Sequence, residues 1–338
     1  MSKCELSVRL EKDPPRFLPG EAVRGEVGVV VNAPCTCNGL TLWFGWRAHG
    51  RGNRVEGPGQ QTTLFRGEWM PGMDQRYPFE FRVPPGPVTY HGKLLNVDWI
   101  LRARADIPWA IDPKAETDLL VGAGEGEEYD FGPRYKPPED LYREAERSRG
   151  SRLFLFLFVA VGGAVVGFLF GFDKPVGLLI AGLSLLGGAA LVLHTMWRGI
   201  AERRLGVPQV RIGTSVARGG EMIPVSVRIR PRAPVRLEGV TVELRGVEEV
   251  VSGSGTNRTT HRNAVHQARE TLDPGGRELP AGEEAIFGGA VEIPADAPPT
   301  FVAPDNSLQW TITLRIGIAG WPDWKRDYPI AVRPRAGE

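Results

Sequence analysis

The chain has 338 residues and a formal net charge of +1, with 41 Lys and Arg against 40 Asp and Glu. This balance excludes nucleic-acid binding driven by bulk positive charge. The 43 glycines and 29 prolines favour turns and short strands over long helices. Three unevenly spaced cysteines do not form the pattern of a disulfide framework.

The first predicted module covers residues 1–121 and consists of short strands separated by turns. In the run 97–109, apolar residues alternate with polar ones, which predicts a strand with one buried face. The expected strands of this module are 18–31, 38–48, 79–84, 97–109 and 117–121. Residues 122–151 follow as a linker, first acidic and glycine-rich and then predicted to form a short juxtamembrane helix.

Two apolar runs, 153–172 and 176–197, dominate the segment 152–198. Each has about the 20 residues that an α-helix needs to cross a bilayer, so we expect a transmembrane hairpin. The alternative is a helical hairpin buried in a large core. Arginines flank the segment on both sides, which predicts that both modules and both termini are cytoplasmic and the hairpin tip is extracytoplasmic.

Small residues recur at intervals of four within the two runs. Such spacing lets two membrane helices approach closely, although glycine is also common in membrane helices in general. The predicted helix-packing residues are Gly163, Gly167, Gly171, Gly177, Ala181, Ser184 and Gly188.

The second predicted module covers 205–338 and repeats five features of the first in the same order, at 218–230, 238–248, 290–294, 308–321 and 328–332. The predicted fold is therefore mostly β, with two antiparallel immunoglobulin-like sandwiches separated by a two-helix transmembrane hairpin. The polar stretch 250–285 is read as a long loop or a hairpin.

Side chains that could carry chemistry are scattered. His261 and His266 lack the spacing of metal ligands, and Cys35 and Cys37 form only a C-x-C, in which one cysteine is expected to face the core. The pattern predicts no catalytic, cofactor or metal site, and no enzyme. Arg228, Arg230 and Arg232 line one strand face, which is either solvated or in contact with anionic lipid headgroups.

The stretch 77–121 resembles the end of the N-terminal domain of arrestins, most of all the α-arrestins. The resemblance is carried by Tyr77 to Phe81, Pro84, Gly92 with Lys93, and the turn of Asp106, Pro108 and Trp109. It implies an arrestin-like tandem of sandwiches and the role of an adaptor. Two features depart from that family. A predicted hairpin occupies the junction, and Pro137-Pro138 is followed by Glu-Asp-Leu-Tyr, which is not the ubiquitin-ligase motif of α-arrestins.

The sequence thus predicts a membrane-tethered, arrestin-like adaptor or scaffold that binds a protein partner at the cytoplasmic membrane face. The alternative is a structural or accessory subunit of a membrane complex, docked through its hairpin. The expected partners are protein and the lipid bilayer, without nucleic acid or cofactor. The sequence does not indicate the identity of the partner, the oligomeric state or the relative orientation of the sandwiches.

Overall fold

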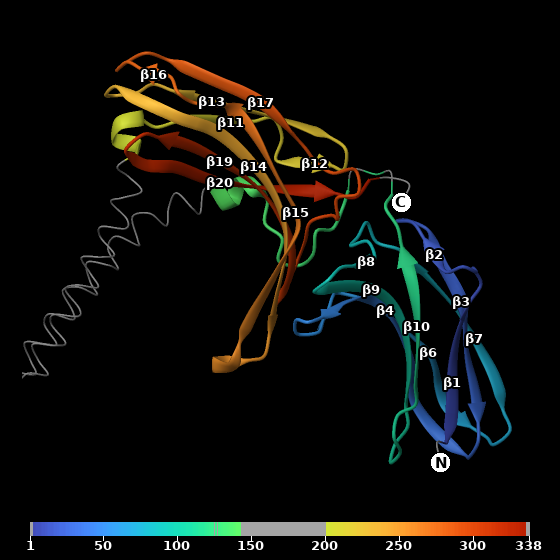
Figure 1. Ribbon diagram of the computed structural model, residues 1–338. Helices are drawn as coiled ribbons and strands as arrows, with labels where there is room; N and C mark the ends of the chain where they lie inside the picture. The colour runs from blue at the N-terminus through green and yellow to red at the C-terminus, as the bar shows by residue number, and fades with distance from the viewer. Residues whose placement is uncertain (1–2, 125, 127, 143–200, 336–338) are drawn as a thin grey trace, which may run out of the picture.

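The computed structural model describes residues 3–124, 126, 128–142 and 201–335, which form two sheet-rich modules (Figure 1). The first module contains β1 (Cys4–Leu10), β2 (Arg16–Phe17), β3 (Ala22–Val31), β4 (Cys35–Gly50), β5 (Val55–Glu56), β6 (Gln60–Trp69), β7 (Asp74–Arg82), β8 (Tyr90–His91), β9 (Leu95–Asp106) and β10 (Lys114–Val121). The second contains β11 (Gln209–Ile212), β12 (Val216–Arg218), β13 (Met222–Ile229), β14 (Val235–Ser252), the 3-10 turn η1 (Gly255–Asn257), β15 (Thr259–Asp273), β16 (Glu278–Leu279), β17 (Ala285–Glu292), β18 (Phe301–Ala303), β19 (Asn306–Ile318) and β20 (Trp321–Arg333). Residues 138–142 and 201–205 are helical.

Each module combines a three-stranded and a seven-stranded sheet. In the first module the orders are β1-β3-β7 and β2-β10-β9-β4-β5, with β6 on β4 and β8 on β9. In the second they are β11-β13-β17 and β12-β20-β19-β14-β15, with β16 on β14 and β18 on β19. The two orders correspond strand for strand, in agreement with the sequence repeat.

The core of each module lies between its two sheets and follows the predicted alternation. Along β9, Trp99, Leu101 and Ala103 are buried, whereas Arg104 and Asp106 are exposed. Successive side chains of a strand point to opposite faces, so one face can be apolar while the other carries charge. The same alternation along β19 buries every second residue from Trp310 to Ile316.

In each module one buried tryptophan ties the seven-stranded sheet to the loop that precedes its strand. The indole Nε1 of Trp99 donates to the carbonyl oxygen of Pro87 at 2.7 Å, and that of Trp310 donates to Pro298 at 2.9 Å. Each bond satisfies an N–H group that would otherwise be buried without a partner, which is the usual requirement for a buried indole.

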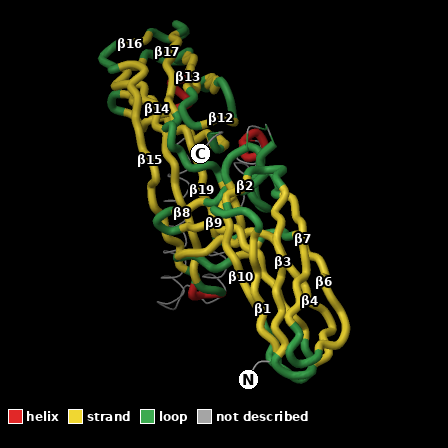
Figure 2. The backbone as a smooth tube through the Cα atoms, turned by 90° about the vertical axis from the view of Figure 1, so that its right-hand side faces the viewer, coloured by secondary structure: helices red, strands yellow, loops and turns green. Residues whose placement is uncertain are grey.

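The polar stretch after residue 250 is a hairpin rather than a loop. β14 and β15 pair from Val240 to Ser252 and form a long ribbon that reaches the first module (Figure 1). The two modules lie end to end when viewed from the side (Figure 2).

The predicted transmembrane hairpin requires correction. Among the described residues, no helix is both long enough and apolar enough to cross a membrane. The runs 153–172 and 176–197 lie outside the described residues. For the described residues, the fold class is therefore corrected to two sheet-rich modules with no membrane-spanning helix, and the membrane-bound character and cytoplasmic location that were inferred from the hairpin are corrected with it. That prediction rested on apolar composition, which indicates that a segment avoids water but not which surface covers it.

Candidate functional site

The most distinctive site of the described chain lies where the two modules touch, around the fully buried side chain of Glu248 on β14. Glu248 Oε1 accepts a hydrogen bond from the Tyr90 hydroxyl at 2.8 Å. Its Oε2 accepts from the Leu94 backbone N–H at 3.2 Å and from Asn263 Nδ2 at 3.0 Å. Two of the three donors belong to the first module, so one buried carboxylate joins both halves of the molecule.

The environment of Glu248 explains why these donors are needed. A buried carboxylate loses its hydration, and hydrogen bonds must replace it. Burial raises the pKa of Tyr90, and the hydrogen bond to Glu248 raises it further, so the hydroxyl stays a donor. Gly92 completes the site, because a Cβ at that position would lie 1.7 Å from Glu248 Oε1.

A second polar contact lies at the loop after β4. Asn53 Nδ2 donates to the Gly253 carbonyl at 2.9 Å and to Asp305 Oδ2 at 2.8 Å, while the Gly253 N–H donates to Asn53 Oδ1 at 3.0 Å. The backbone carbonyl of Asn53 accepts from Asn306 Nδ2 at 2.7 Å. Asn53 is thus held by the second module through both its side chain and its backbone.

An apolar contact accompanies the polar ones. Trp46 of β4 meets Phe301 of β18 edge to face, with ring centroids 5.3 Å apart. Such a pair is worth about 0.5–1.5 kcal/mol beyond the area that it buries. The contact therefore combines a buried carboxylate, a hydrogen-bonded amide and an aromatic pair, and these favour one relative orientation of the modules.

The linker after β10 also bridges the modules. The Tyr129 hydroxyl accepts from the Val88 N–H of the first module at 3.4 Å. Two residues further on, the Phe131 carbonyl accepts from the Val302 N–H at 2.7 Å, and the Arg134 N–H donates to the Val302 carbonyl at 3.0 Å. The linker therefore makes two backbone hydrogen bonds to β18 without forming a strand itself, since residues 133 and 134 are in a turn.

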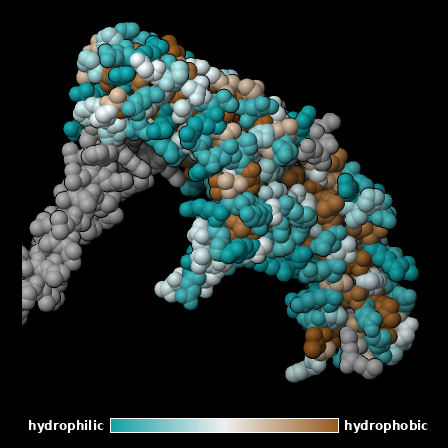
Figure 3. All heavy atoms as spheres, in the orientation of Figure 1, coloured by the Kyte–Doolittle hydropathy of each residue, from teal (hydrophilic) through white to brown (hydrophobic). Residues whose placement is uncertain are grey.

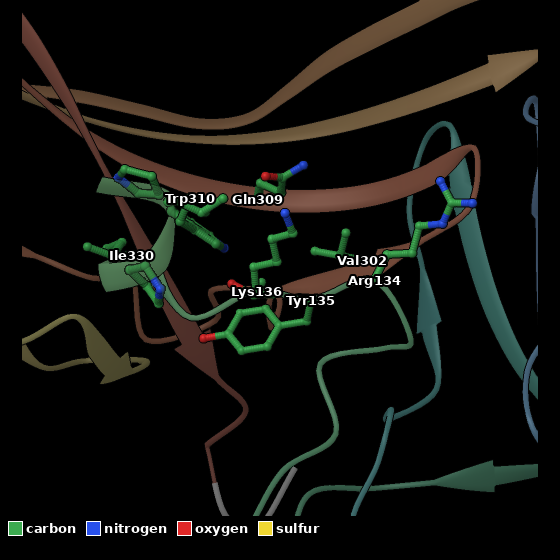
Figure 4. Close-up of a pocket in the computed structure, with 11 residues that line it drawn as sticks. Arg134, Tyr135, Lys136, Val302, Gln309, Trp310 and Ile330 are labelled. Atoms are coloured by element: carbon green, nitrogen blue, oxygen red, sulfur yellow. The ribbon is translucent and has the colours of Figure 1, made fainter. Parts of the chain in front are cut away.

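Two hollows flank these contacts. A pocket of about 270 Å³ lies between the linker and the second module, where Lys136 extends toward Gln309 beside Trp310 (Figure 4). A larger groove of about 870 Å³ lies between the modules and is lined on one side by Phe17 and Leu120 and on the other by residues that include Val265. Apolar side chains gather on the surface near this junction (Figure 3).

The histidines and cysteines considered above as possible metal ligands do not gather into one cluster within the described residues. His261 lies 3.2 Å from Ser252 Oγ, and His266 packs against Trp310. Cys35 and Cys37 are both buried, because alternate residues of a strand share a face, whereas the sequence led us to expect only one to point inward. Burial raises the pKa of both thiols and raises that of the nearby Cys4 to about 11. Within the described residues, no group of His, Cys, Asp and Glu side chains could hold a metal ion.

The three arginines of the predicted headgroup face are exposed, on and just after β13. Arg228 Nε lies 3.6 Å from Glu284 Oε1, and Arg230 Nε donates to the Gly282 carbonyl at 3.0 Å. Contact with lipid headgroups stays a prediction, and it depended on the membrane hairpin. The predicted helix-packing residues, Gly163, Gly167, Gly171, Gly177, Ala181, Ser184 and Gly188, lie outside the described residues.

Glu248 was missed by the sequence analysis although a signal was present. Val240, Val242 and Leu244 are in phase along β14 and are buried, and Glu248 continues the same phase. A carboxylate at an inward position of an otherwise apolar alternation indicates a specific partner.

Comparisons with known proteins give the following result. No family model matches the chain, and no curated protein matches it. Among solved structures, the chain is similar to the crystal structure of Spo0M, a sporulation control protein from Bacillus subtilis, with 22% identity and a TM-score of 0.31. The match covers 37% of this chain and 51% of Spo0M, so it spans about half of that protein. A likeness at this level carries no argument about function.

Proposed function

We propose that this chain is an arrestin-like adaptor or scaffold, in which two β-sandwich modules held in one orientation bind a protein partner. The observation that supports it best is the contact around Glu248. Burying a carboxylate costs several kcal/mol unless it is well hydrogen-bonded, and here the donors come from both modules. Such a contact favours a defined orientation, which a two-module binding surface requires.

A non-enzymatic role is part of this proposal. The polar groups at the contact are hydrogen-bonded to one another across the modules: Glu248 to Tyr90, and Asn53 to Asp305. In this arrangement their hydrogen bonds join the modules. Tyr90 also lines the groove between them, but its hydroxyl is held by Glu248. The arrestin-like resemblance of 77–121 supports the same interpretation.

Replacing Glu248 tests the proposal. Glu248→Ala leaves the Tyr90 hydroxyl and the Leu94 N–H without their acceptor, so we expect it to lower the free energy of unfolding by about 2–4 kcal/mol. Affinity purification of the full chain followed by mass spectrometry should recover a reproducible protein partner, and Glu248→Ala should reduce its recovery at least severalfold. Glu249→Ala is the matched control, because Glu249 is partly exposed and, among the described residues, its carboxylate pairs with Arg262 across the strand surface.

Two results would contradict the proposal. One is the absence of any reproducible partner of the wild-type chain. The other is a partner that binds the Glu248→Ala chain as well as the Glu249→Ala chain, under conditions in which small-angle scattering shows that the first substitution has changed the arrangement of the modules.

A further inference from the structure

The outer edge of β18 in the second module is occupied by the chain itself. Phe131 and Arg134 of the linker make two backbone hydrogen bonds to Val302, at 2.7 and 3.0 Å. Gly132 lies between them with a φ of 98°, and a Cβ there would be 2.6 Å from the Val302 carbonyl oxygen. Glycine therefore allows the linker to approach this strand closely.

The corresponding position in the first module is His91. In each module a threonine that follows the proline loop exchanges hydrogen bonds with the last strand: Thr89 with Val121, and Thr300 with Val332. His91 and Val302 both lie two residues after these threonines. Each also belongs to a short strand that pairs only with the next one, β8 with β9 and β18 with β19.

The backbone N–H and C=O groups of His91 point away from β9. The Gly92 N–H donates to the Leu95 carbonyl at 2.9 Å, which makes Gly92 and Leu95 a hydrogen-bonded pair of the hairpin. In antiparallel pairing such pairs alternate with pairs that exchange no hydrogen bonds, and His91 opposite Asn96 is the next pair. Its N–H and C=O therefore face the outer side, where no strand of the described chain pairs with β8.

The side chains around this edge favour an acidic ligand. His91 is exposed over 61% of its side chain, and Lys93 and Arg51 are exposed on the adjoining loops. Two acidic groups lie near His91. Asp98 is only 17% exposed and accepts hydrogen bonds from both His49 and His91, the latter at 2.6 Å. Burial raises the pKa of Asp98, but these two hydrogen bonds outweigh it and lower the pKa overall. Glu248 is fully buried and accepts from the Tyr90 hydroxyl and the Leu94 N–H.

We propose that the open edge of β8 at His91 binds an extended acidic segment of the partner protein, which accepts from the His91 N–H and donates to its C=O, the two backbone groups that are already occupied at Val302. This proposal rests on the adaptor function and names its binding edge. Addition of a strand to a free edge is an established mode of peptide recognition.

Proline substitution gives a direct test, because His91→Pro removes the outward N–H, which β9 does not use. His91→Ala is the matched control, since it removes the imidazole and keeps the N–H. The probe is a fluorescein-labelled hexapeptide of alternating glutamate and valine, and the full chain is titrated by fluorescence anisotropy. We expect the peptide to bind His91→Pro about tenfold more weakly than His91→Ala, and a lysine–valine peptide to bind neither.

Hydrogen exchange in the unmodified chain provides a second measurement, which does not depend on how well the proline variant folds. The amide of His91 should exchange rapidly in the free protein and slowly with the glutamate–valine peptide, whereas the amide of Val302 should be slow in both. Equal peptide binding by both variants, or a His91 amide that is already slow without peptide, would overturn the proposal.

The two proposals fail in different ways. A cellular partner that copurifies equally with His91→Pro and His91→Ala would remove the β8 edge as its site but leave the adaptor function standing. Failure to find any partner of the wild-type chain would count against the adaptor function itself.

Discussion

At the start of β3 in the first module, the Leu18 N–H donates to Glu21 Oε2 at 3.0 Å; at the start of β13 in the second, the Arg218 N–H donates to Glu221 Oε2 at 2.9 Å. The glycine before each glutamate has nearly the same positive φ, 84° at Gly20 and 83° at Gly220. The two modules therefore share their turns and their strand order. These common turns and this common strand order specify the sandwich fold.

The modules differ where they touch. By the pairing of β4 with β9 and of β14 with β19, Ala48 of the first module corresponds to Glu248 of the second, and both are buried. Likewise His91 on an open edge corresponds to Val302 on an occupied one. These two differences lie where the modules touch and at an exposed strand edge.

The largest expected effect tests whether the shared framework stabilises both modules equally. Trp99→Ala and Trp310→Ala each remove a large buried side chain and leave a proline carbonyl without its donor, so we expect each to cost about 3–5 kcal/mol. Denaturant unfolding measures the loss in the free energy of unfolding, and hydrogen exchange shows which module opens. Trp109→Ala is the control because Trp109 is fully exposed, and a comparable loss there would contradict the assignment.

A smaller effect tests the matching turns. A Cβ added at Gly20 or Gly220 meets no atom within 4 Å. The stability lost in Gly20→Ala or Gly220→Ala should therefore come from the left-handed backbone conformation alone, about 1–2 kcal/mol. Thermal unfolding should show similar losses of stability for these two variants. Gly288→Ala also has open space and no positive φ, and it should be neutral or slightly stabilising. A loss at Gly288 as large as at Gly20 would show that backbone conformation is not the cause.

The smallest effect concerns surface charge, where the modules use different residues. Hydrogen bonds from Arg102 and Arg54 lower the pKa of Glu56 to about 2, and Arg269 lowers that of Glu243. A carboxyl with a depressed pKa in the folded state stabilises it above its ordinary pKa of 4.5, and this stabilisation is lost as the pH falls toward 2. Glu56→Gln should therefore cost up to about 1 kcal/mol at neutral pH, because solvent screens a carboxylate whose side chain is 35% exposed.

The pH profile distinguishes this effect from a loss of packing. The difference in unfolding free energy between wild type and Glu56→Gln should shrink between pH 4.5 and 2, and Glu243→Gln should behave in the same direction. A difference that does not change with pH would contradict an electrostatic origin.

Much of the fold could be predicted from the sequence. The alternation in 97–109 placed β9 and its buried face, because a strand repeats every two residues. The repeated order of strands predicted two similar modules. The site could not be read in the same way: Tyr90 and Glu248 are 158 residues apart, and no local pattern indicates that a hydroxyl and a carboxylate so distant will meet.

The apolar runs 153–172 and 176–197 mark the limit of reasoning from composition, since the predicted hairpin fold and the location inferred from it had to be corrected. The sequence by itself determined the strands, the turns and the duplication, since these depend on residues close together in the chain. Only the tertiary structure decided that Glu248 is buried against the first module, that the linker hydrogen-bonds to Val302, and that His91 keeps an open edge. Each of these depends on how distant segments pack, and packing sets which polar groups find partners and which remain exposed.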